Sequence, residues 1–109
     1  MEIAEHIDAL EAEIEPFVAA VESAGLDAPV PTCPDWVVRD LVHHMGGVHR
    51  WAALHVREAR KDLVDEDLVD VVGGWPPDSE TVAWFREGHR QLVDEIGRAS
   101  CRERVFAVV

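Results

Sequence analysis

Apolar residues spaced three or four apart dominate the stretch from Thr32 to Arg60. This spacing places them on one face of a helix, and it predicts a helix from about residue 35 to residue 60. Thr32 or Asp35 could cap the start of that helix, and Pro34 suits its first turn. The stripe consists of Val37, Leu41, His44, Val48, Trp51 and His55. We expect this face of the helix to point into the core.

Two further segments carry the same helical spacing. Residues 2–24 hold one apolar stripe, and residues 79–96 hold another behind Asp78 or Ser79, either of which is a good helix cap. The first stripe is Ile3, Ile7, Leu10, Ile14, Phe17 and Val21, and the second is Val82, Phe85, His89, Leu92 and Ile96. Residues 61–77 lack a regular pattern, so we expect a loop there with at most a turn of helix.

These patterns predict an all-α fold in which three helices pack as part of an antiparallel bundle and no two strands pair. Gly46 and Gly47 each cost about 1 kcal/mol of helix propensity relative to alanine. We interpret the pair as a place where another helix approaches closely, because the apolar stripe continues in phase on both sides of it. Pro16 should bend or divide the first helix, because proline removes a backbone hydrogen bond.

Composition narrows the class of protein. The chain has 109 residues, enough for one small domain, and its net charge of −12 disfavours the phosphate backbone of nucleic acid as a partner. No apolar run approaches the length of a membrane span, and the N-terminus lacks a signal-peptide pattern. Two cysteines, Cys33 and Cys101, do not make a disulfide framework. We therefore expect an acidic, soluble, cytoplasmic domain.

His44 interrupts the central apolar stripe, and a buried imidazole there needs a partner. A metal ion, another side chain or water could each fill that role. Asp40 precedes His44 by one helical turn, so its carboxylate could orient the imidazole or merely sit near the helix start. His89 also lies in a stripe, where a hydrogen bond to a neighbouring group is a simpler interpretation than metal ligation. No two histidines have the spacing of a helical metal-binding pair.

The C-terminal segment differs from the acidic body that precedes it. Residues 95–105 read EIGRASCRERV, and their back-translation closely resembles a common sequencing adapter read in frame. We therefore divide the chain into a helical domain at residues 1–95 and a tail at residues 96–109 that we expect to be an artefact. Under this interpretation the natural sequence is cut off near Asp94 or Glu95.

The segment VPTCPDWVVRDLVHHMGGVHRWAA resembles the N-terminal signature of the mycothiol-dependent maleylpyruvate isomerase family, which belongs to the wider DinB-like group. The matching residues are Pro31, Thr32, Cys33, Pro34, Trp36, Val38, Asp40, Leu41, Val42, His44, Val48, His49, Arg50 and Trp51. VAWFREGH, at residues 82–89, is similar to a second block found in close members. The resemblance spans about the first 94 residues and implies a four-helix bundle, of which we expect three helices here.

The resemblance also implies a divalent metal, usually zinc, held between the helices. The histidine that is the first metal ligand in the signature corresponds to His44, and Asp40 would then support it. The other two ligands belong to an E-x-x-x-H block downstream, which this sequence lacks after His44, because the position four before His89 is Phe85. A single ligand does not hold zinc tightly. We therefore expect weak or no zinc binding and little isomerase activity from this chain.

The implied chemistry uses the thiol mycothiol as cosubstrate and a small molecule as substrate. The thiolate adds to a cis double bond, rotation follows, and elimination gives the trans product. Two alternatives stay open, namely a DinB-like metal-binding protein with another thiol-transferase or detoxification role, and a non-catalytic helical module that binds a partner. We also expect the missing fourth helix to leave an exposed apolar face that is prone to self-association.

Overall fold

The computed structural model is mostly helical, and this confirms the predicted fold class. It describes the backbone of residues 3–59, 62 and 66–108. Side chains are described for residues 5, 8–59, 62 and 66–99. Three residues of the sequence predictions, Ile3, Ile7 and Cys101, therefore have side chains outside the described set. Within the described part of the chain, no helix is both long and apolar enough to cross a membrane.

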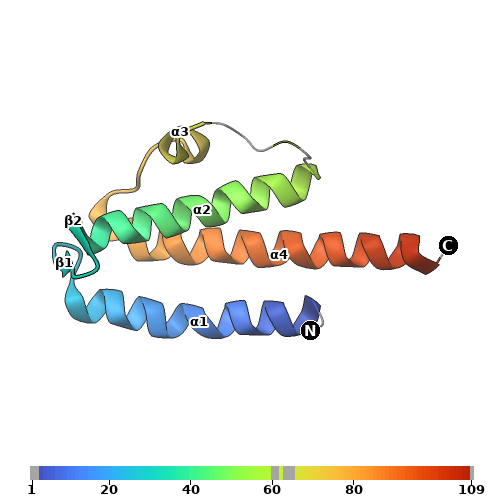
Figure 1. Cartoon of the computed structure of the whole chain (residues 1–109), viewed down its shortest axis with the longest axis horizontal. Coiled ribbons are helices and arrows are strands. Elements are labelled where there is room, and N and C mark those ends of the chain that lie inside the picture. Colours follow the sequence, from blue (N-terminus) through green and yellow to red (C-terminus); the bar gives the residue numbers. More distant parts are fainter. Residues whose placement is uncertain (1–2, 60–61, 63–65, 109) are drawn as a thin grey trace.

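Three long helices make up most of the fold (Figure 1). They are α1 (Ile3–Ala24), α2 (Val38–Glu58) and α4 (Thr81–Val108). The short helix α3 (Leu68–Val72) lies in the connection between α2 and α4 and is the turn of helix expected there. A 3-10 turn at Asp78–Glu80 leads into α4. The α4 helix extends past its predicted end, because the segment beyond it contains no proline to stop it.

A short hairpin joins α1 to α2, so the expectation that no strands pair was wrong. Strand β1 (Pro29–Val30) pairs antiparallel with β2 (Cys33–Val37). Because β2 occupies the residues assigned to the first helical turn, α2 begins at Val38 and not near residue 35. The hairpin therefore decides where the central helix starts.

Backbone groups cap the start of α2. The N–H groups of Val38 and Arg39 donate to the carbonyl oxygens of Ala28 and Leu26, and both N–O distances are 2.9 Å. These carbonyls satisfy donors that have no partner inside the helix. The side-chain caps predicted from the sequence were therefore wrong, because the chain before the hairpin folds back onto the helix start.

The α2 and α4 helices run in the same direction, and α1 runs opposite to both (Figure 1). The connection through α3 carries the chain back along α2, so α4 begins beside the start of α2. Arg39 fixes this return by donating to both carboxylate oxygens of Asp78, at 2.7 and 2.8 Å. The prediction of an antiparallel bundle was therefore wrong for α2 and α4, because a long connection lets neighbouring helices run parallel.

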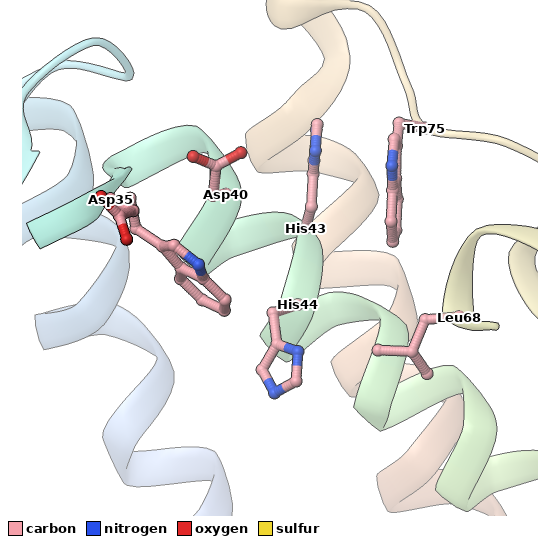
Figure 2. Close-up of a pocket in the computed structure, with 7 residues that line it drawn as sticks. Asp35, Asp40, His43, His44, Leu68 and Trp75 are labelled. Carbon is pink, nitrogen blue, oxygen red and sulfur yellow. The ribbon is translucent and has the colours of Figure 1, made fainter. Parts of the chain in front are cut away.

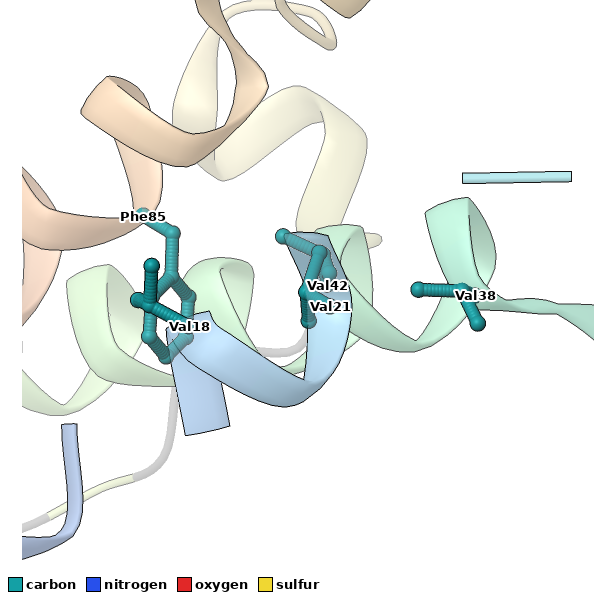
Figure 3. Close-up of a cluster of buried hydrophobic side chains, with 5 residues drawn as sticks. All are labelled: Val18, Val21, Val38, Val42 and Phe85. Carbon is teal, nitrogen blue, oxygen red and sulfur yellow. The ribbon is translucent and has the colours of Figure 1, made fainter. Parts of the chain in front are cut away.

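The core lies where α1, α2 and α4 meet (Figure 3). Its buried members are Val18, Val21, Val38, Val42 and Phe85. A fully buried valine or phenylalanine side chain stabilises a fold by about 1.5–3 kcal/mol. The ring of Phe17 adds to this cluster, with its centroid 4.8 Å from that of Phe85. The predicted stripe of α4 is confirmed at its centre, since Phe85, His89 and Leu92 are all buried.

The α1 helix packs against α4 and carries an exposed acidic face. Glu5, Asp8, Glu11, Glu13 and Glu15 are exposed, and Glu15 pairs with Arg86 of α4. The helix continues through Pro16, so Pro16 does not divide α1, and the alternative prediction of a bend there stays a prediction.

The buried face of α2 differs from the predicted one. Its buried residues are Val38, Val42, His43, Gly46, Gly47 and Ala53. His44 and Val48, which belong to the predicted stripe, are exposed. Glycine adds nothing to hydrophobic periodicity, so the pattern favoured the bulky side chains of another face.

The glycine pair is nevertheless a site of close helix approach, as predicted. A Cβ atom added at Gly46 would lie 3.0 Å or less from three atoms of the Trp84 ring in α4. A Cβ atom at Gly47 would lie 3.3 Å from Leu68 of α3. The two glycines therefore let two different helices pack against α2.

Candidate functional site

A pocket of about 330 Å³ opens beside the N-terminal half of α2 (Figure 2). Residues of β2, of α2, of α3 and of the segment before α4 line it. They are Asp35, Trp36, Asp40, His43, His44, Leu68 and Trp75. The pocket contains both site residues predicted from the sequence, His44 and Asp40, and we call it the His44 pocket.

His44 is exposed on α2, so the expectation that it points into the bundle was wrong. Its ring meets the Trp36 ring edge-on, with 5.5 Å between the centroids and 61° between the planes. Trp36 comes from β2, so the hairpin places an indole beside this imidazole. The arrangement leaves His44 accessible to a molecule that enters the pocket.

Asp40 stabilises the start of α2. Its Oδ2 accepts the backbone N–H of Val37 at 3.0 Å. A carboxylate in the first turn of a helix also interacts favourably with the positive end of the helix dipole. This contact agrees with the interpretation that Asp40 lies near the helix start. The other interpretation, that Asp40 orients the His44 imidazole, stays a prediction.

His43 lines the pocket, with its ring beside that of Trp75 (Figure 2). Its buried ring stacks on Trp75 with 4.8 Å between centroids and 7° between planes, and it meets Trp84 edge-on at 6.1 Å. Burial lowers the pKa of His43, although the nearby charge of Asp40 acts in the opposite direction. Its Nε2 has no hydrogen-bond partner within the described part of the chain. The imidazole therefore packs as a neutral aromatic ring at pH 7.

Two arginines hold the elements around the pocket in place. Arg39 joins α2 to Asp78 and also to Asp27, the latter at 2.9 Å, and its hydrogen bonds lower the pKa of Asp78. Arg50 lies over the Trp84 ring at 4.9 Å and donates to the Trp84 carbonyl oxygen at 2.9 Å. These contacts fix α4 against α2 and so fix the aromatic wall behind His43.

Of the five pocket residues that were not predicted as site residues, Trp75 and Leu68 lie farthest along the chain from the signature. Both belong to residues 61–77, where we expected a loop with at most a turn of helix. Gly73 and Gly74 adopt positive φ angles of 76° and 107°, which direct the chain from α3 back toward α2. A tryptophan between a glycine pair and a proline pair was the available indication, because glycine and proline mark a turn that can bring the tryptophan to another part of the fold.

A resident zinc ion does not fit the described residues. No three His, Cys, Asp or Glu side chains lie close enough together to hold a metal ion in the part of the chain whose side chains are described. Protein zinc sites use three or four such ligands. His44 and the carboxylates of its pocket therefore do not complete a zinc site here, and the role of His44 as a ligand stays a prediction.

His89 lies outside the His44 pocket and packs against His49, with 5.6 Å between ring centroids. The hydrogen bond predicted for His89 is absent at its Nε2, for which no described residue is a partner. His49 of α2 and His89 of α4 therefore belong to a separate region of the fold.

Comparison with known protein families identifies the chain. It matches the family model described as the mycothiol maleylpyruvate isomerase N-terminal domain over residues 7–108. No curated protein and no solved structure gives a significant match. The matched range covers nearly the whole sequence and every residue that lines the His44 pocket, and the fold of this domain is DinB-like. The chain therefore belongs to the family of mycothiol maleylpyruvate isomerase N-terminal domains.

Proposed function

We propose that this chain is a domain of a mycothiol-dependent, maleylpyruvate isomerase-like enzyme, and that its His44 pocket is where the thiol and a small-molecule substrate meet. The observation that carries the proposal is the family match over residues 7–108. The pocket supports it, because aromatic walls and a few polar groups that converge in one cavity are typical of small-molecule sites.

The residues of the pocket have distinct roles in this proposal. His44 offers an accessible imidazole that can accept the proton of a thiol, and a thiolate is the nucleophile required for addition to a double bond. Trp36 and Trp75 provide flat apolar surfaces for the ligand. Asp35 and Asp40 provide carboxylate oxygens that accept hydrogen bonds from hydroxyl or amide groups.

Zinc binding by His44 is a separate part of the proposal. A coordinated zinc ion deprotonates a bound thiol outright. Because the described residues do not complete a zinc site, we propose that this chain by itself binds zinc weakly through His44, and no step of the reaction is assigned to the metal.

The charge of the chain supports a small-molecule partner. A net charge of −12 repels nucleic acid, whose affinity for proteins depends on basic residues that neutralise phosphates. A cytoplasmic location belongs to the same proposal, because the thiol cosubstrate is a cytosolic one. A related enzyme with another thiol-transferase role would use the same pocket, whereas a non-catalytic module would not need to bind a thiol.

Isothermal titration of the chain with mycothiol tests this function. We expect saturable binding that is roughly tenfold weaker in His44→Ala, which corresponds to the loss of one good hydrogen bond, and unchanged in the control His55→Ala. Glutathione serves as the non-cognate thiol, and equal affinity for it would favour a broader thiol-transferase role. Absence of saturable heat with mycothiol, or equal affinity in His44→Ala, would contradict the proposal.

A further inference from the structure

A second pocket lies between α1, α2 and α4. Its volume is about 270 Å³, and it shares no lining residue with the His44 pocket. Its apolar walls come from Leu10, Ile14, Phe17, Met45 and Phe85. We call it the His89 pocket. An engineered apolar cavity of about 150 Å³ is large enough to hold benzene, so this pocket has room for a substituted single ring.

Two histidines of the pocket lining carry unsatisfied polar atoms. His89 is only 7% exposed, and His49 is half-buried. His89 Nε2 and His49 Nδ1 are both buried and find no hydrogen-bond partner among the described residues. A buried nitrogen without a partner destabilises the fold, and each such atom in a native structure calls for an explanation. The pocket therefore favours a ligand that has a hydrogen-bonding group as well as an apolar body.

The charge around the pocket disfavours an anionic ligand. Burial lowers the pKa of His49 and of His89, so both rings are neutral at pH 7, although the charge of Glu11 opposes the effect at His89. Glu13 is the charged residue in the described lining, and neither lysine nor arginine joins it there. A neutral imidazole carries one N–H donor and one acceptor nitrogen. A neutral hydroxyl group complements such a pair, because it can donate to one ring and accept from the other.

We propose that the His89 pocket binds a neutral, single-ring phenol, with its ring against Phe17 and Phe85 and its hydroxyl group toward His89 Nε2 and His49 Nδ1. This site is independent of the function proposed for the His44 pocket, because the two pockets have no residue in common.

Titrations of the ¹⁵N-labelled full chain with phenol and with toluene, followed by NMR, test this proposal. Toluene replaces the hydroxyl group with a methyl group of similar size. We expect saturable shifts of the His49 and His89 ring nitrogens with phenol, and binding of toluene that is roughly 2- to 10-fold weaker, as expected for the loss of one hydrogen bond. In His89→Leu the advantage of phenol over toluene should decrease, because one of the two hydrogen-bond partners of the hydroxyl group is removed.

The control variant is His44→Ala, which should bind phenol as the parent does, so that failure of this proposal is separate from failure of the mycothiol proposal. If His89→Leu does not give the helical circular-dichroism spectrum of the parent, His49→Leu provides the same comparison, because it removes the second nitrogen. Absence of saturable shifts with phenol, equal affinity for phenol and toluene in the parent, or shifts confined to Trp36 and Trp75 would each overturn the proposal.

Discussion

The close approach of α4 to α2 at Gly46 predicts that Gly46→Ala destabilises the protein, although alanine is the better helix former. A Cβ atom at this position would lie 3.0 Å or less from three atoms of the Trp84 ring. The indole cannot move away cheaply, because Arg50 lies over it and the rings of His43 and Trp75 meet it edge-on. The methyl group must therefore displace a packed ring or push the helices apart.

The opposing effects can be compared in magnitude. Replacing glycine by alanine inside a helix stabilises it by about 1 kcal/mol. Overpacking a well-packed interior costs about 1–3 kcal/mol, and the overlap here is severe enough for the upper part of that range. We therefore expect Gly46→Ala to lower the free energy of unfolding by about 1–2 kcal/mol.

Urea denaturation followed by circular dichroism measures this change. Gly97→Ala is the matched control, because Gly97 lies in α4 with no atom within 4 Å of an added Cβ, and it should stabilise the protein by up to about 1 kcal/mol. Adding Trp84→Leu to Gly46→Ala should cost less than the sum of the two single changes, because the smaller side chain makes room for the methyl group. If Gly46→Ala proves as stable as the parent, the close packing inferred for this crossing is wrong.

Three further predictions concern histidines. His43→Ala should lower the free energy of unfolding by about 1–2 kcal/mol, because the ring contacts with Trp75 and Trp84 are lost. His44→Ala, at an exposed position, should change it by less than about 0.5 kcal/mol. Urea denaturation that finds His44→Ala the more destabilising of the two would contradict this prediction. Burial lowers the pKa values of His43, His49 and His89 in the folded state, so the unfolded state binds more protons below the usual imidazole pKa of about 6.5. Stability should therefore be fully present above about pH 6.5 and decrease as the pH falls toward the lowered values, and a urea midpoint that stays constant between about pH 7.5 and pH 5.5 would be inconsistent with neutral buried rings. Equilibrium dialysis against zinc should leave less than one equivalent on the chain, with the residual binding lost in His44→Ala and kept in His43→Ala; a full equivalent in both variants would rule out His44 as the ligand.

Periodicity was enough to predict the long helices and the buried face of α4, and not enough to predict the buried face of α2 or the direction of α4. The stripe of α4 was correct at Phe85, His89 and Leu92, because large apolar residues there also form the contacts. In α2 the close contacts with α3 and α4 form at Gly46 and Gly47, which have no side chain and so do not contribute to the hydrophobic pattern. The direction of α4 depends on a connection whose course is fixed by long-range contacts such as Arg39 with Asp78.

The candidate site was predictable in part from the signature residues. His44 and Asp40 were found by their place in the motif, and the structure brings both into one pocket. Trp75 reaches the same pocket from far along the chain, and single-sequence reasoning does not place such a residue beside His43. The expected self-association and the division at residue 95 both stay predictions.

The central claim is that the His44 pocket binds the thiol cosubstrate, and the indole N–H resonances of the chain test it most directly. Trp36 and Trp75 line the pocket, whereas Trp51 lies outside its lining and serves as an internal control. As mycothiol is added, we expect the resonances of Trp36 and Trp75 to shift saturably in the parent, and to need roughly tenfold more mycothiol for the same shift in His44→Ala, while Trp51 stays unchanged in both. Shifts that are equal in the parent and His44→Ala at each mycothiol concentration, or no shift at Trp36 and Trp75, would contradict the account.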